Sequence, residues 1–125
     1  YIAGEGVSGF QTRIKAWQAA HAETIAGLPE PTGFRLVPRA ANFLKPQDVE
    51  NLYSAVVAFA QTWDFIVIDT VSRSIAGQDE NKQEVMSTFV DVSTRLSEKL
   101  RAFVLGIHHP SKAGEMRGST VFEGG

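Results

Sequence analysis

Cysteine is absent from the 125-residue chain, which excludes disulfide bonds, thiolate metal sites and cysteine nucleophiles. A surplus of positive charge is absent too, because 12 Lys and Arg stand against 14 Asp and Glu. A nucleic-acid partner would therefore be held by local loops rather than by a broad cationic face. No apolar run approaches the roughly 18 residues of a membrane helix. We accordingly expect no membrane segment and a cytoplasmic location.

The residues that are present are typical of a soluble globular protein, with 43% hydrophobic and 21% charged side chains. The length suffices for one domain with a hydrophobic core and is too short for two. The chain opens on Tyr1 inside an apparent strand, both methionines are internal, and the last residues are Gly124 and Gly125. We therefore expect residues 1–125 to be a single domain from the middle of a longer protein.

Apolar residues alternate along the chain between short continuous runs, typical of buried strands, and stripes at helical spacing. Strands are predicted at residues 1–3, 34–37, 65–68 and 102–107, with a further strand at 121–122. Helical stripes are predicted at Phe10, Ile14 and Trp17; at Val49, Leu52, Tyr53, Val56 and Ala60; and at Val85, Phe89, Val92, Leu96 and Leu100. Strands that alternate with helices indicate an α/β fold with a mainly parallel sheet covered by helices.

Polar side chains follow three of these strands. Glu5 comes after the first, Asp69 and Thr70 after the third, and His108 and His109 after the fourth. In an open parallel sheet ligands bind beyond the carboxyl ends of the strands, so we expect these residues to converge on one edge. The acid that ends the run FIVID is typical of a Walker B aspartate, which holds Mg²⁺ through water beside nucleotide phosphates. The alternative is an aspartate that only caps the following turn.

The stretch GEGVSG admits two interpretations. Gly4, Gly6 and Gly9 match the dinucleotide fingerprint G-x-G-x-x-G, which would make the chain an NAD(P)-binding Rossmann domain. However, Glu5 would then lie beside a pyrophosphate that repels it. Near the γ-phosphate of ATP, a carboxylate at this position would instead orient and polarise the attacking water. The second interpretation makes the carboxylate the functional part of the stretch.

The adjacent histidines at the end of the 102–107 strand also admit two interpretations. Neighbouring strand residues point to opposite faces, so His108 and His109 are poorly placed to ligate one metal ion together. One imidazole could sense the γ-phosphate or the catalytic water. Alternatively, a polar residue at this point only ends the strand and caps a turn.

Taken together, several segments resemble RepA-type helicases, the RecA-like, ring-forming replicative ATPases of plasmids, phages and mobile elements. The segments are YIAGEGVSGFQTRIKAW (1–17), FIVIDTVSRSIAGQDEN (65–81), VLGIHHPSKAG (104–114) and MRGSTVFEGG (116–125). The resemblance implies a RecA-like P-loop NTPase core, in which helices cover both faces of a mainly parallel sheet. It also implies an ATP-hydrolysing DNA helicase that works as a homo-oligomeric, hexameric ring on single-stranded DNA.

The same resemblance assigns roles to the residues at the strand ends. It implies that Asp69 is the Walker B acid and holds Mg²⁺ through water, and that Glu5 is the catalytic base. It implies that His109 is the γ-phosphate sensor, with His108 as the alternative. Thr70 and His108 complete the expected set of residues that bind ATP and Mg²⁺.

Outside the strand ends, the resemblance implies that Lys112 and Arg117 lie in a loop facing single-stranded DNA or a neighbouring subunit. The chain also departs from the family, since G-x-x-x-x-G-K-[ST] occurs nowhere in the 125 residues. We expect this Walker A segment before Tyr1 and an arginine finger after Gly125, so the domain is incomplete at both ends and inactive alone. A non-hydrolysing RecA-like module for assembly or DNA loading is the alternative.

Overall fold

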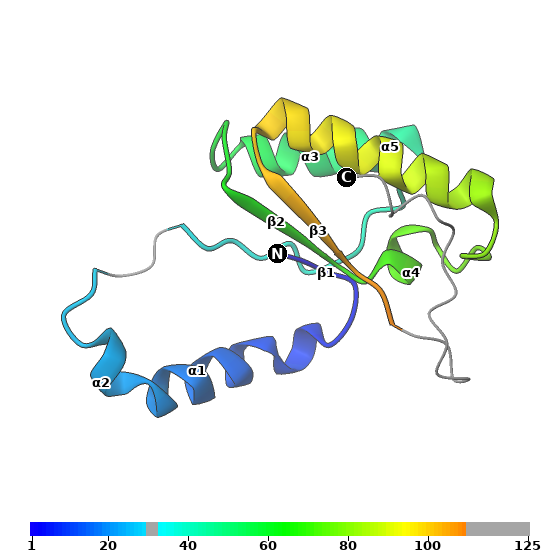
Figure 1. Cartoon of the computed structure of the whole chain (residues 1–125). Helices are drawn as coiled ribbons and strands as arrows, with labels where there is room; N and C mark the ends of the chain where they lie inside the picture. The colour runs from blue at the N-terminus through cyan, green and yellow to red at the C-terminus, as the bar shows by residue number, and fades with distance from the viewer. Residues whose placement is uncertain (30–32, 110–125) are drawn as a thin grey trace.

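The structure is a computed structural model that describes residues 1–29 and 33–109. The strand expected at 121–122, and the loop with Lys112 and Arg117, lie outside the described residues. In chain order the elements are β1 (Ile2–Ala3), the 3₁₀ helix η1 (Val7–Gly9), α1 (Phe10–Ala20), α2 (Ala22–Ile25), α3 (Pro46–Val57), β2 (Phe65–Asp69), α4 (Val71–Ser74), α5 (Gln83–Leu100) and β3 (Phe103–Ile107). Figure 1 shows their arrangement.

The described strands form a three-stranded sheet in the order β1-β2-β3. Both pairings are parallel, and β2 is paired along its whole length with β3, from Phe65 opposite Phe103 to Asp69 opposite Ile107. Continuous apolar runs are what strands of a buried parallel sheet require. The predicted α/β class with a parallel sheet is therefore confirmed.

The segment expected as a strand at residues 34–37 forms only an isolated parallel bridge, between Ile2 and Val37. The amide of Val37 donates to the Tyr1 carbonyl at 2.8 Å, and the amide of Ala3 donates to the Val37 carbonyl at 2.9 Å. The next residue is Pro38 and a bend follows at Arg39, so the pairing with β1 goes no further. The predicted strand is thus reduced to a single bridge beside β1.

The hydrophobic core lies between one face of the sheet and the helices α3 and α5 (Figure 1). Ile66 and Ile68 of β2 point to this face, because side chains alternate along a strand, and both are buried. Helix α5 contributes Met86, Phe89, Val92, Leu96 and Leu100, a stripe at helical spacing. Helix α3 has Pro46 in its first turn and ends at Val57, so Ala60 of the expected stripe lies beyond it.

The opposite face of the sheet is much less covered by the described residues. Helix α1 runs on that side of the molecule (Figure 1) but buries none of its residues. Phe65 and Phe103 stack on each other with ring centroids 5.5 Å apart, and they remain 50% and 63% exposed. Packing of helices onto the sheet is therefore seen on one face only within residues 1–29 and 33–109. No described helix is long and apolar enough to cross a membrane.

Candidate functional site

The carboxyl ends of the strands meet at one edge of the sheet, as the sequence predicts. Ala3 lies opposite Asp69, and Asp69 lies opposite Ile107. Beyond this row, the amide of Gly4 donates a 2.5 Å hydrogen bond to the Asp69 carbonyl. The residues that follow β1 and β2 are therefore neighbours in space, and the residues that follow β3 lie at the same edge of the sheet.

Asp69 ends β2 on the face of the sheet that α3 and α5 do not cover, since it alternates with buried Ile66 and Ile68. Its Oδ2 accepts a hydrogen bond from the hydroxyl of Tyr1. Burial and this contact with the carboxylate raise the pKa of Tyr1 to about 12. The phenol thus stays protonated at neutral pH and remains a donor to Asp69. Tyr1 is a partner that sequence reasoning did not identify.

Thr70 follows Asp69 through a cis peptide bond and is almost fully buried, with 1% of its surface exposed. Its Oγ1 accepts the amide hydrogen of Arg73 at 3.4 Å, which caps the N-terminus of α4. The short helix α4, which the sequence analysis did not predict, buries Val71 and Ser74. Thr70, expected among the nucleotide-binding residues, is placed here as the residue that fixes the turn after β2.

Glu5 lies in the turn after β1, and its Oε1 accepts a hydrogen bond from Nε of Arg73 at 2.9 Å. The two side chains also form an ion pair, with exposed fractions of 42% for Glu5 and 61% for Arg73. Arg73 belongs to α4, so this contact joins the ends of β1 and β2 through side chains. Sequence reasoning missed Arg73, and its only signal was a cation shortly after the aspartate that ends β2.

The glycines of GEGVSG serve the turn rather than a packed strand–helix junction. Gly4 approaches α4 closely, since a Cβ atom placed there would lie 2.7 Å from Cβ of Arg73. Gly6 has a positive φ of 62°, which favours glycine. A Cβ on Gly9 would meet only the Arg13 guanidinium, whereas the third glycine of a dinucleotide loop allows close helix–strand packing. Helix α1 buries no residue against the sheet. The close helix–strand packing that a dinucleotide-binding loop requires is therefore missing here.

The two histidines have different surroundings. Nε2 of His108 contacts the carboxylate of Glu80, which precedes α5, and both side chains are about a quarter exposed. His109 is exposed to solvent. Alternation beyond β3 gives the two residues opposite directions. The structure therefore brings His108 together with Glu80, a residue the sequence analysis did not single out, and leaves His109 available at the edge.

Asp69 is the residue at this edge of the sheet whose carboxylate is placed to contact Mg²⁺. No described group of three or more His, Asp or Glu residues is arranged to hold a metal ion. A lone carboxylate at a strand end fits contact with Mg²⁺ through water, because this ion keeps several waters and takes its remaining oxygens from phosphates. Asp69 is therefore suited to hold a nucleotide-bound Mg²⁺, and not to hold a free ion alone.

The fold and the site together describe an α/β protein in which Glu5 follows β1, Asp69 ends β2 and His108 follows β3, at the same edge of the parallel sheet. A family model described as an AAA domain matches residues 1–115. The chain therefore belongs to this AAA domain family, whose members are P-loop ATPases. No curated protein and no solved structure matches the chain.

Proposed function

We propose that residues 1–125 are the central part of an ATP-hydrolysing motor domain of the replicative DNA helicase type. The observation that carries the proposal is the hydrogen bond between Gly4 and Asp69, which places Glu5 beside the end of β2. An acid that contacts nucleotide-bound Mg²⁺ and a second acid nearby are the two carboxylates that ATP hydrolysis requires. Membership of the AAA domain family supports the same activity.

In the proposed mechanism Asp69 holds Mg²⁺ through water, and Glu5 orients the attacking water and accepts its proton. Mg²⁺ bound together with ATP would supply positive charge that stabilises the phosphoryl oxygens. His109 lies exposed at the same edge and contacts the γ-phosphate. Positioning and electrostatic stabilisation account for the rate, without a covalent intermediate.

The link to DNA rests on the RepA-type resemblance and on residues outside the described ranges. Lys112 and Arg117 contact single-stranded DNA or a neighbouring subunit of a homo-oligomeric ring. Since the whole chain carries a net charge of −2, such local cations are the means by which it holds a polyanion.

The test compares ATP turnover by the whole protein, including its Walker A segment, with turnover by two variants. Asp69→Asn removes the Mg²⁺ contact, whereas Asp79→Asn changes an exposed aspartate whose Oδ1 accepts from Asn81. The proposal expects Mg²⁺-dependent turnover that single-stranded DNA stimulates, at least about a hundredfold loss in the first variant and none in the second. DNA binding without any ATP turnover in the unmodified protein would instead identify a non-hydrolysing loading module.

A further inference from the structure

We propose that Arg73 is a positioning residue for Glu5: its guanidinium holds the carboxylate in the orientation from which it accepts a proton from water. The inference rests on the proposed function, because it concerns how the candidate base is held. Its starting observation is the 2.9 Å hydrogen bond from Nε of Arg73 to Oε1 of Glu5, which joins residues 68 positions apart in the sequence.

Arg73 is itself held in place by its helix. Its amide donates to Oγ1 of Thr70 at 3.4 Å, and α4 is anchored by buried Val71 and Ser74. The Cβ atom of Arg73 also lies so close to Gly4 that a side chain there would clash at 2.7 Å. The stem of Arg73 therefore packs on the backbone directly before Glu5, and its guanidinium reaches a carboxylate whose position is otherwise set by rotatable bonds alone.

The contact between the Arg73 guanidinium and the Glu5 carboxylate is of the kind that orients the carboxylate, not of the kind that occupies both of its oxygens. Only Oε1 of Glu5 is engaged, by a single nitrogen, whereas an arginine that locks a carboxylate away commonly binds both oxygens. Among the described residues Oε2 has no hydrogen-bond partner. This oxygen is free to accept from a water molecule while the other is held. The contact thus restrains the candidate base without occupying it.

Because the ion pair between Glu5 and Arg73 is exposed, its effect on turnover can be measured apart from any effect on folding stability. Both side chains are more than a third exposed, and ion pairs in such surroundings contribute little to stability. Removing the guanidinium should therefore alter the orientation of Glu5 far more than the stability of the domain. A misplaced catalytic group lowers turnover, while the affinity for ATP, which other groups determine, is retained.

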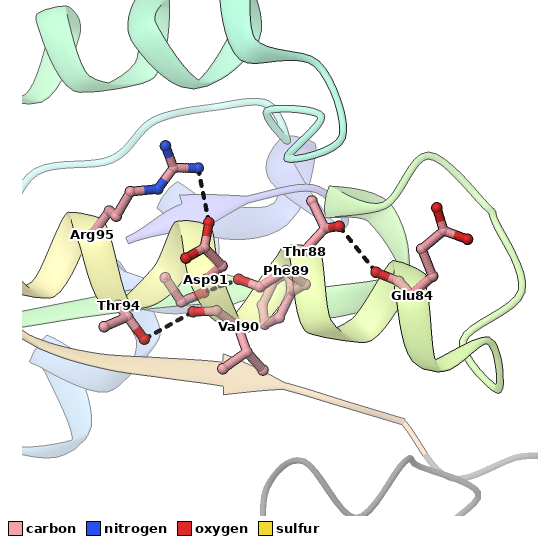
Figure 2. A network of polar contacts seen from close by, with 8 residues as sticks. Glu84, Thr88, Phe89, Val90, Asp91, Thr94 and Arg95 are labelled. Carbon is pink, nitrogen blue, oxygen red and sulfur yellow. Dashed lines mark hydrogen bonds and ion pairs between the residues drawn. The ribbon is translucent and has the colours of Figure 1, made fainter.

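The experiment measures kcat and KM for ATP in the whole protein with Arg73→Met, Arg73→Lys and Arg95→Ala. Methionine keeps the apolar stem on Gly4 and removes the charge, and lysine restores a donor without the planar fork. Arg95 is the matched control, since it also forms an exposed ion pair, at 3.2 Å with Asp91 on α5 (Figure 2). We expect Arg73→Met to lower kcat about 10- to 100-fold with KM changed less than about twofold. Arg73→Lys should recover part of the loss, and Arg95→Ala should match the unmodified protein.

Adding Glu5→Gln separates failure of this inference from failure of the proposed function. If Arg73 acts only through Glu5, Arg73→Met lowers turnover no further in a Glu5→Gln background. An unchanged or raised kcat for Arg73→Met, alongside an inactive Glu5→Gln variant, overturns the positioning role and leaves the assignment of the base intact. Full activity of Glu5→Gln overturns both. Melting temperatures of all variants identify any loss of turnover that arises from unfolding. If Arg73→Met unfolds, the kcat of Arg73→Lys, compared with that of the unmodified protein, tests the positioning role instead.

Discussion

The amide of Gly4 donates a 2.5 Å hydrogen bond to the carbonyl oxygen of Asp69. This contact continues the pairing of β1 with β2 past the last ladder position, Ala3 opposite Asp69. It fixes the backbone before Glu5 against the turn after β2. The geometry of the candidate site is therefore determined first by main-chain contacts and only then by side chains.

The approach at Gly4 predicts that even a methyl group is costly there. In Gly4→Ala the new Cβ would lie 2.7 Å from Cβ of Arg73 and 3.0 Å from the Asp69 carbonyl oxygen. We expect a loss of about 1–3 kcal/mol in the free energy of unfolding, as for other overpacked sites. Gly33→Ala is the control, since a Cβ atom added at Gly33 would meet no heavy atom within 4 Å; it should change stability by less than about 0.5 kcal/mol. Chemical denaturation of both variants measures the difference, and equal stabilities would contradict the packing described at Gly4.

The hydrogen bond from Tyr1 to Asp69 predicts a characteristic alkaline titration. Because the pKa of Tyr1 is raised to about 12, the unfolded chain releases this phenolic proton first, near its ordinary pKa of about 10. The stabilisation from Tyr1 is therefore complete below about pH 10 and is lost as the pH rises through about 12. Ultraviolet absorbance should show a phenolate step near pH 12 that Tyr1→Phe removes and Tyr53→Phe retains. A step for Tyr1 near pH 10 in the folded protein would be inconsistent with the contact.

The two histidines should respond differently to substitution. His108→Ala leaves the partly buried Glu80 without its contact, so we expect the domain to lose about 1–3 kcal/mol of stability. His109→Ala changes an exposed residue and should leave stability within about 0.5 kcal/mol while it lowers ATP turnover. Thermal unfolding and ATPase assays of the two variants check this division. Lost turnover with unaltered stability in His108→Ala, and an unaffected His109→Ala, would reverse the assignment.

The sequence predicted the elements whose side chains form the core. The apolar run of β2 and the helical stripe of α5 are regular patterns, and both elements form as predicted. Helix α5 buries its stripe, whereas β2 buries only Ile66 and Ile68 and leaves Phe65 half exposed on the uncovered face. The strand expected at residues 34–37 was wrong in extent, since its pairing stops at a single bridge before Pro38. Short helix α4 has no apolar period to reveal it and depends on the cap from Thr70.

The position of the candidate acids and histidines at one edge of the sheet was predictable, but their side-chain partners were not. The rule that parallel strands end at one edge places Glu5 and Asp69 together. Contacts such as Arg73 with Glu5, 68 positions apart, depend on side-chain geometry that no local pattern encodes. The same holds for Glu80 with His108. Such pairs form between elements that only the folded chain brings together.

The most direct test of the central claim is ATP hydrolysis by the whole protein with Glu5→Gln. Glutamine keeps the size of the side chain and cannot accept the proton of the attacking water at neutral pH. We predict that steady-state turnover falls at least about a thousandfold, while binding of a fluorescent ATP analogue with Mg²⁺ stays within about twofold. Undiminished turnover in this variant would contradict the assignment of Glu5 as the catalytic base and, with it, the proposed organisation of the site.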